Sequence, residues 1–335
     1  MAAGFEEIVR RALGVDVPGA RIVQVESGSI VLEGDDALGR TLAALPYISM
    51  LLLELVRVDQ PNFDRAIVDL ARALSGKPIP SSLRDVRTFR IRTSDGGRLI
   101  RVDPEARRTL ESAIAEWSGA RPDARGGGSE FWVTRRTGDR FVSLGARVDA
   151  TRQARPKAGA LKPDLAAALV RAVPPRDDDV VLDPFAGSGA LVRERARMPY
   201  RLLFATDVDP AIAAELARSV RAGVFGPRAT SAQLDVREVN ALVDIVGDAN
   251  VDVVLADPPW GLFARPAGGV DALYDSAFMA FRRVLAPGGR VVLLTGAIAS
   301  AEAAMHKHGF KVEESFPVLV NGKKARVVVT APQDA

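Results

Sequence analysis

From residue 179 to residue 295, short runs of β-branched residues alternate with stretches that have helical spacing. We expect strands at 179–183, 202–207, 230–234, 251–256 and 290–295. Strands that alternate with helices are typical of a parallel sheet with helices on both faces. Two further segments, 311–319 and 324–331, flank Asn321-Gly322, a strong hairpin signal. The predicted fold class is therefore α/β, with a doubly wound sheet that ends in an antiparallel pair.

Three aspartates stand where the first three of these strands end, and they suggest a ligand site. Asp183 opens the turn DPFAGSG, in which Gly187 and Gly189 allow the backbone to approach a ligand closely. The turn is neither a dinucleotide fingerprint nor a phosphate loop, and Asp183 would repel phosphate but could accept hydrogen bonds from an ammonium group. Asp207 follows about 20 residues later, where a carboxylate holds a ribose diol. Asp235 is placed for the exocyclic amine of an adenine.

Together these three roles fit S-adenosyl-L-methionine. Each aspartate taken alone could equally be a helix cap or a turn former.

The fourth strand runs into Asp257-Pro258-Pro259-Trp260, and then into Gly261. Both prolines have a fixed φ and no N–H, so this stretch is rigid and its carbonyl groups can point outward as acceptors. A carboxylate, carbonyls and an aromatic plane suit a planar base that carries an exocyclic amine. A simple turn that ends a core strand would show the same residues.

The first half of the chain predicts smaller α+β units. Residues 21–27 and 29–35 read as paired strands, and we expect the apolar run 42–56 to form a buried helix. We also expect a linker near Pro78 and Pro80, a strand at 86–93, a helix at 103–118 capped by Asp103, and a hairpin over 131–147. A further helix, 164–173, would begin with Asp164 as its cap.

Charge and composition narrow the function classes. Residues 81–160 hold 17 Lys and Arg against 10 Asp and Glu, which favours a polyanionic partner, although arginine is abundant throughout the chain. Cysteine is absent and only two histidines occur, so we expect no disulfide, no metal site and no Ser–His–Asp triad. We see no secretory signal and no membrane-spanning run, and expect a cytoplasmic protein.

The motifs DPFAGSG and DPPWG resemble motifs I and IV of the Rossmann-fold amino-methyltransferases, which methylate exocyclic amines of nucleobases. Residues 1–160 resemble the ferredoxin-like and THUMP domains of the tRNA guanine-N2 methyltransferases. The resemblance implies a Rossmann-fold methyltransferase sheet preceded by two small α+β domains. It implies these boundaries: a ferredoxin-like domain at 1–76, a THUMP RNA-binding domain at 77–148, a linker at 149–163 and the methyltransferase domain at 164–333.

The implied activity is methylation of guanine N2 in tRNA by a monomer that uses S-adenosyl-L-methionine. The expected catalytic residues are Asp257, Pro258 and Trp260. The expected cofactor-binding residues are Asp183, Phe185, Ala186, Gly187, Ser188, Gly189, Asp207, Val208, Asp235 and Val236. The expected substrate-binding residues are Pro259, Trp260, Gly261, Arg265, Arg87, Arg90 and Arg92.

The modified position stays open. The DPP opening resembles enzymes that act at position 10 of tRNA, whereas relatives that act at position 6 often open with Asn. The same motifs are also compatible with methylation of rRNA guanine N2 or of adenine N6, and with a non-catalytic protein that only binds tRNA.

Overall fold

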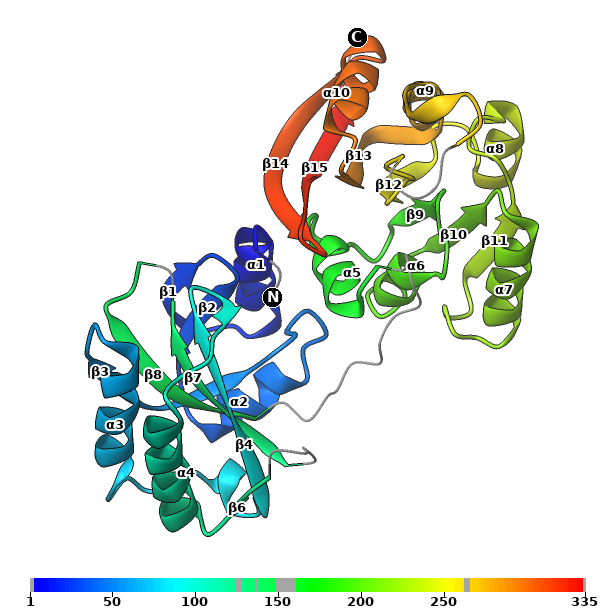
Figure 1. Cartoon of the computed structure of the whole chain (residues 1–335). Helices are drawn as coiled ribbons and strands as arrows, with labels where there is room; N and C mark the ends of the chain where they lie inside the picture. The colour runs from blue at the N-terminus through cyan, green and yellow to red at the C-terminus, as the bar shows by residue number, and fades with distance from the viewer. Residues whose placement is uncertain (1–2, 124–127, 137, 149–160, 262–265, 334–335) are drawn as a thin grey trace. The chain divides into compact units, whose positions relative to one another are not determined.

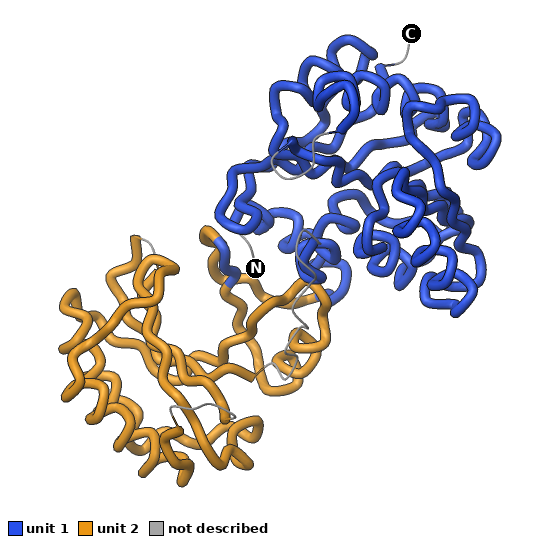
Figure 2. The backbone as a smooth tube through the Cα atoms, turned by 45° about the vertical axis from the view of Figure 1, so that its right-hand side comes forward, with its two compact units in different colours: residues 1–18, 28–30, 153–335 blue, residues 19–27, 31–152 orange. Residues whose placement is uncertain are grey.

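The computed structural model describes residues 3–123, 128–136, 138–148, 161–261 and 266–333. The chain divides into two compact units (Figure 2). Unit 1 comprises residues 1–18, 28–30 and 153–335, and unit 2 comprises residues 19–27 and 31–152.

Unit 1 is built on a seven-stranded sheet with the strand order β11-β10-β9-β12-β13-β15-β14. Its strands are β9 (Val180–Asp183), β10 (Leu202–Asp207), β11 (Ala229–Gln233), β12 (Val251–Ala256), β13 (Leu285–Thr295), β14 (Phe310–Val320) and β15 (Lys323–Pro332). Its helices are α1 (Glu6–Asp16), α5 (Pro163–Leu169), α6 (Ala190–Arg195), α7 (Pro210–Arg221), α8 (Val239–Val246), α9 (Gly269–Val284) and α10 (Ile298–Lys307).

The first five strands of this sheet are parallel, and β15 runs antiparallel to both β13 and β14. The predicted doubly wound α/β sheet with a terminal hairpin is thus confirmed. Figure 1 shows α8, α9 and α10 above the sheet and α5, α6 and α7 below it. The upper helices share one apolar core with β9, β12 and β13, to which Val180, Phe278 and Phe281 belong.

The chain runs outward from β9 through β10 to β11 and then returns to β12 on the other side of β9. This reversal makes a topological switch point at the carboxyl ends of β9 and β12. Open α/β sheets bind their ligands in the crevice at such a point.

Unit 2 holds a sheet with the order β3-β8-β7-β4-β5, and β6 also pairs with β4. Its strands are β3 (Leu52–Asp59), β4 (Thr88–Asp95), β5 (Arg98–Leu99), β6 (Arg121–Pro122), β7 (Ser129–Arg135) and β8 (Phe141–Arg147). Its helices are α2 (Asp36–Ala43), α3 (Phe63–Leu74), the short 3-10 turn η1 (Ser81–Leu83) and α4 (Pro104–Ser118). The strands β1 (Arg21–Glu26) and β2 (Ser29–Glu33) form a separate two-stranded sheet.

Helices α3 and α4 pack together and share a core with β4, β7 and β8 (Figure 1). The boundary expected at residue 76 falls inside this unit, because β3 pairs with β8 and α3 packs against α4. Residues 1–18, for their part, belong to unit 1. The expected linker 149–163 lies mostly outside the described residues.

Two expected helices are corrected by the structure. The helix expected over 42–56 is wrong, since α2 ends at Ala43 and β3 begins at Leu52. Pro46 cannot continue a helix, and the apolar residues after it find cross-strand partners on β8. The helix expected over 164–173 begins one residue earlier and ends at Leu169. Lys162 occupies its N-cap position without a side-chain cap hydrogen bond, and Asp164 lies in its first turn. The Asp103 cap is confirmed, with its carboxylate accepting from Glu105 N and Ala106 N.

Candidate active site

The turn between β9 and α6 is shaped by its two glycines. Gly187 and Gly189 have φ values of +50° and +73°, a region that favours glycine. A Cβ on Gly189 would also lie 2.8 Å from Cζ of Phe225, so the position has no room for a side chain. The remaining predicted residues of this turn differ in exposure: Phe185 is partly buried, Ala186 is buried and Ser188 is exposed.

Asp183 ends β9 with a buried carboxylate that is only half satisfied. Its side chain is almost fully enclosed, and Oδ1 accepts a 3.2 Å hydrogen bond from Phe185 N. Among the described residues, nothing donates to Oδ2. Burial, followed by the neighbouring carboxylates of Asp257 and Asp207, raises the pKa of Asp183 well above its usual range. A buried acceptor without a donor costs free energy, and a cationic or N–H-bearing ligand group would remove that cost.

Asp207 ends β10 and is attached to the glycine turn. Its Oδ2 accepts from Gly187 N over 2.9 Å, and its Oδ1 accepts from Asp209 N over 3.0 Å. The next residue, Val208, is 57% exposed. An oriented carboxylate beside an exposed apolar residue suits a ligand that carries a diol next to a flat ring.

Asp235 follows β11, but its carboxylate already has a partner. Arg237 Nε lies 2.9 Å from both carboxylate oxygens, and this ion pair lowers the pKa of Asp235. Arg237 also donates to the carbonyl of Ala267 over 2.9 Å. Val236 is buried in the apolar core of unit 1. Hydrogen bonding of an adenine amine by Asp235 therefore stays a prediction, and any such amine would share the carboxylate with Arg237.

The segment after β12 places an acid and an aromatic ring together. Trp260 Nε1 donates a 3.2 Å hydrogen bond to Oδ1 of Asp257, and no donor among the described residues reaches Oδ2. Burial raises the pKa of Asp257 to about 7, while the Trp260 hydrogen bond acts in the opposite direction. Pro258 is buried, whereas Pro259 is partly buried. With its pKa raised toward neutrality, Asp257 can accept either a hydrogen bond or a proton.

The backbone of Gly261 ends this segment in a conformation that favours glycine. Its φ is +77°, and a Cβ there would lie 2.7 Å from Cγ2 of Val270 on α9. Arg265, which we expected to contact substrate, lies outside the described residues.

Two residues beside Asp257 were not singled out as site residues by the sequence. Tyr274 on α9 is fully buried and forms a 2.6 Å hydrogen bond with Thr295 Oγ1. Burial, and to a smaller extent the charge of Asp257, raises the pKa of Tyr274. Gly296 follows β13, and a Cβ there would lie 2.6 Å from Cε3 of Trp260. A glycine at the end of a strand next to β12 was the only sequence signal for this contact.

The three expected RNA-contacting arginines lie in unit 2 and differ in their surroundings. Arg90 donates to Glu130 over 2.9 Å, and Arg92 lies 3.8 Å from the same carboxylate. Glu130 is itself buried and also accepts from Trp132 Nε1 over 3.2 Å. Arg87 is exposed, and no described carboxylate pairs with it. Arg87 is thus the one of the three whose side chain has no acid partner within the described part of the chain.

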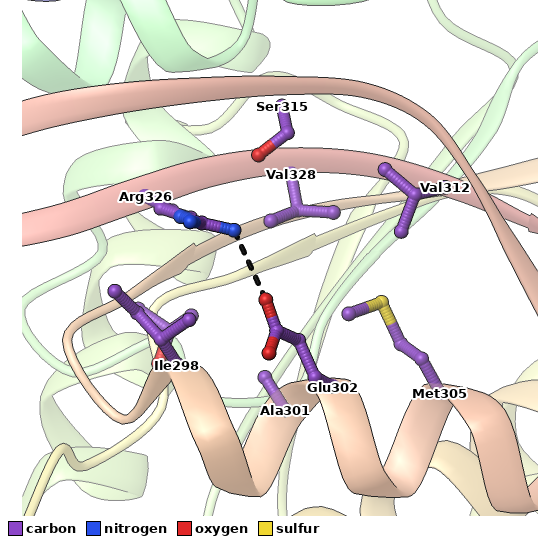
Figure 3. A pocket seen from close by; sticks show the side chains of 9 residues that line it. Ile298, Ala301, Glu302, Met305, Val312, Ser315, Arg326 and Val328 are labelled. Carbon is purple, nitrogen blue, oxygen red and sulfur yellow. Dashed lines mark hydrogen bonds and ion pairs between the residues drawn. The ribbon is translucent and has the colours of Figure 1, made fainter.

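A hollow lies between α10 and the β14–β15 hairpin, and Figure 3 shows the side chains that line it. Its lining is mainly apolar and includes the 3.0 Å ion pair between Arg326 and Glu302. None of the predicted site residues lines it. Within the described ranges, no group of three or more acidic or histidine side chains could hold a metal ion. The described helices are all too short or too polar to cross a membrane.

Comparison with known proteins gives matches along the whole chain. The family model described as RMKL-like, methyltransferase domain, matches residues 152–326. The chain is 29% identical to a tRNA (guanine(6)-N2)-methyltransferase of Thermus thermophilus, over 97% of this chain and 96% of that protein. It is 25% identical to a tRNA (guanine(10)-N2)-dimethyltransferase of Methanothermobacter thermautotrophicus, over 51% of this chain and 48% of that protein.

A solved structure resembles the whole chain as well. The crystal structure of TrmN from Thermus thermophilus matches with a TM-score of 0.82 and 26% identity. The match covers 99% of this chain and 98% of that chain.

Proposed function

The chain belongs to the family of RMKL-like methyltransferase domains, and on that basis we propose that it methylates N2 of a guanosine in tRNA with S-adenosyl-L-methionine. The observation that carries this proposal is the pairing of Asp257 with Trp260 at the sheet's switch point, within a chain similar along its length to a tRNA guanine-N2 methyltransferase. We propose position 6 as the target. The full-length relative acts there, whereas the match to the position-10 relative spans about half of either chain.

The strand-end acids fit the cofactor by their chemistry. The unpartnered Oδ2 of Asp183 would accept from the ammonium group, and Asp207 would hold the ribose diol. Val208 offers its exposed apolar surface to the adenine ring. When bound, S-adenosyl-L-methionine supplies an electrophilic methyl group.

The residues of the DPPW segment act on the target base. Oδ2 of Asp257 and the carbonyl of Pro258 would accept the two N–H groups of guanine N2, turning the nitrogen lone pair toward the incoming methyl group. Because the nitrogen becomes positively charged as the bond forms, a carboxylate placed beside it stabilises the transition state. Asp257 then takes the released proton, which its pKa of about 7 allows. Trp260 would stack on the flipped base, a contact worth about 1–3 kcal/mol in comparable systems.

We assign tRNA binding to unit 2, which carries residues 81–152 of the basic stretch, and we further propose that the protein acts as a cytoplasmic monomer. Sedimentation of the purified protein, alone and with tRNA, would test the monomer.

The test of the activity uses three tRNA transcripts: one with guanosine at positions 6 and 10, and two with adenosine replacing either guanosine. After incubation with S-adenosyl-L-methionine, mass spectrometry of the digested nucleosides should find N2-methylguanosine in the first transcript and in the one altered at position 10. The transcript altered at position 6 should give none.

Each other outcome has a clear meaning. Loss of product only in the transcript altered at position 10 would move the target to that position. N6-methyladenosine as the product would favour an adenine methyltransferase. Binding of tRNA without any methylated nucleoside would point to a non-catalytic protein.

A further inference from the structure

The ring of Trp260 lies directly against the backbone of Gly296. Because β12 and β13 are parallel neighbours, with Ala256 opposite Leu293, the segments that follow them leave the sheet side by side. A Cβ on Gly296 would lie 2.6 Å from Cε3 and 3.0 Å from Cδ2 of the indole, closer than real Cβ contacts come. These indole atoms are not the end of a flexible chain, since the same ring donates from Nε1 to Asp257. The ring therefore cannot move away from residue 296 without disturbing that hydrogen bond.

The residues on either side of Gly296, Thr295 and Ala297, are joined by a hydrogen bond. Thr295 Oγ1 accepts a 2.9 Å hydrogen bond from Ala297 N, which spans the glycine. The same hydroxyl forms the 2.6 Å hydrogen bond with Tyr274, and both side chains are about 1% exposed. The φ of Gly296 lies outside the region reserved for glycine, so its backbone would accept alanine. Glycine is required here for space and not for backbone conformation.

We propose that Gly296 is a positioning residue for methyl transfer: its bare backbone seats the Trp260 indole so that Nε1 stays bonded to Oδ1 of Asp257 and Oδ2 remains for the substrate amine. This inference rests on the proposed role of Asp257. It assigns the segment 295–297, with Tyr274 behind it, to the active site. The hydrogen bond from Trp260 also favours the ionised form of Asp257, so a displaced indole changes the acid as well as its orientation.

The direct test is Gly296→Ala. The added methyl group pushes the indole off its seat, and Asp257 loses a hydrogen bond to its charged form. We expect kcat to fall by about tenfold or more and the acid limb of its pH profile to move up by about one unit. The KM for S-adenosyl-L-methionine should stay within about twofold, because the seat touches none of the three cofactor acids. Gly14→Ala is the matched control, since a Cβ there meets nothing within 4 Å.

Two further variants separate positioning from general damage to the fold. Trp260→Phe removes the indole N–H, so adding Gly296→Ala to it should produce no further shift of the pH profile. Thr295→Val leaves Ala297 N without its acceptor and should shift the profile in the same direction as Gly296→Ala. An equal shift by Gly296→Ala with and without the indole would overturn the proposal, as would an unchanged profile in the single variant.

A measurement without substrate keeps this inference distinct from the proposed function. The chain has three tryptophans, so Trp117→Phe with Trp132→Phe leaves Trp260 as the only indole. Its fluorescence should titrate with a midpoint near the Asp257 pKa of about 7, and Gly296→Ala should move that midpoint upward. An unmoved midpoint would refute the positioning of Trp260 by Gly296, whatever the enzyme's activity. A moved midpoint in a protein that makes no N2-methylguanosine would refute the proposed function but support the positioning of Trp260 by Gly296.

Discussion

The backbone N–H of Gly187 donates to Oδ2 of Asp207 over 2.9 Å and so joins the glycine turn after β9 to the end of β10. The second oxygen of Asp207 is held by Asp209 N. The carboxylate is therefore oriented before any ligand arrives, which reduces the entropy lost on binding. The same contact means that the turn and the acid cannot be altered independently.

Replacement of Asp207 should weaken cofactor binding strongly. Asp207→Ala removes the acceptor for the ribose diol and frees Gly187 N, so we expect the affinity for S-adenosyl-L-methionine to drop by about tenfold or more. Isothermal titration calorimetry measures this directly. The neighbouring Asp209→Ala is the control: it removes the cap of α7 and costs about 1 kcal/mol of stability, with little change in affinity. An unchanged isotherm in Asp207→Ala would exclude the ribose role.

Replacing Asp183 by asparagine should stabilise the folded protein at pH 8 and weaken its binding of S-adenosyl-L-methionine. Its folded pKa lies above the unfolded value, so its contribution to stability is fully present below pH about 4 and is lost as the pH rises toward the folded pKa. Asp183→Asn cannot ionise and should therefore be more stable than the natural protein at pH 8, with little difference near pH 4. Urea denaturation without ligand at both pH values checks this sign. The same variant should bind S-adenosyl-L-methionine poorly, because it presents no charge to the ammonium group.

Asp257→Ala should reduce turnover strongly while leaving the cofactor site intact. We expect a loss of about 10²–10³-fold in kcat, with the affinity for S-adenosyl-L-methionine within about twofold of the natural protein. In the natural protein, turnover should fall below pH 7, since protonation of Asp257 removes the acceptor for the amine and the proton. Near-normal turnover in the variant, or a flat profile between pH 6 and 8, would contradict the assignment.

Arg87 should contribute to the affinity of the protein for tRNA. Its guanidinium is exposed and has no acid partner among the described residues, so it is available to a phosphate group. We expect Arg87→Ala to reduce the slope of log K against log salt by about one. Arg72→Ala is the control, because Arg72 is equally basic but pairs with Asp69 at 3.3 Å. Equal slopes for the two variants would show that Arg87 does not contact the RNA.

The strands, the helix cap and the hairpin that the sequence predicts correctly are determined by residues close to one another in the chain. The strands 202–207 and 251–256 are predicted to the residue, because runs of apolar and β-branched side chains bounded by Asp or Pro carry their own limits. The Asp103 cap and the Asn321-Gly322 hairpin are equally local. Residues 42–56 show the limit of that approach, since an apolar run fits a buried helix and a buried strand alike. Only pairing with β8 selects the strand that begins at Leu52.

Much of the candidate site was also visible in the sequence, since strand order brings the ends of β9, β10 and β12 together and their terminal aspartates come with them. What the tertiary structure alone decided is which charged side chains are already paired and how Asp257 is held. Glu130 takes the guanidinium of Arg90, 40 residues earlier in the chain, and Gly296 makes room for the Trp260 ring that orients Asp257. The physical reason is that a carboxylate's pKa and its remaining hydrogen-bonding capacity depend on burial and on partners that can be distant in the chain, whereas its place at a strand end is written in the residues beside it.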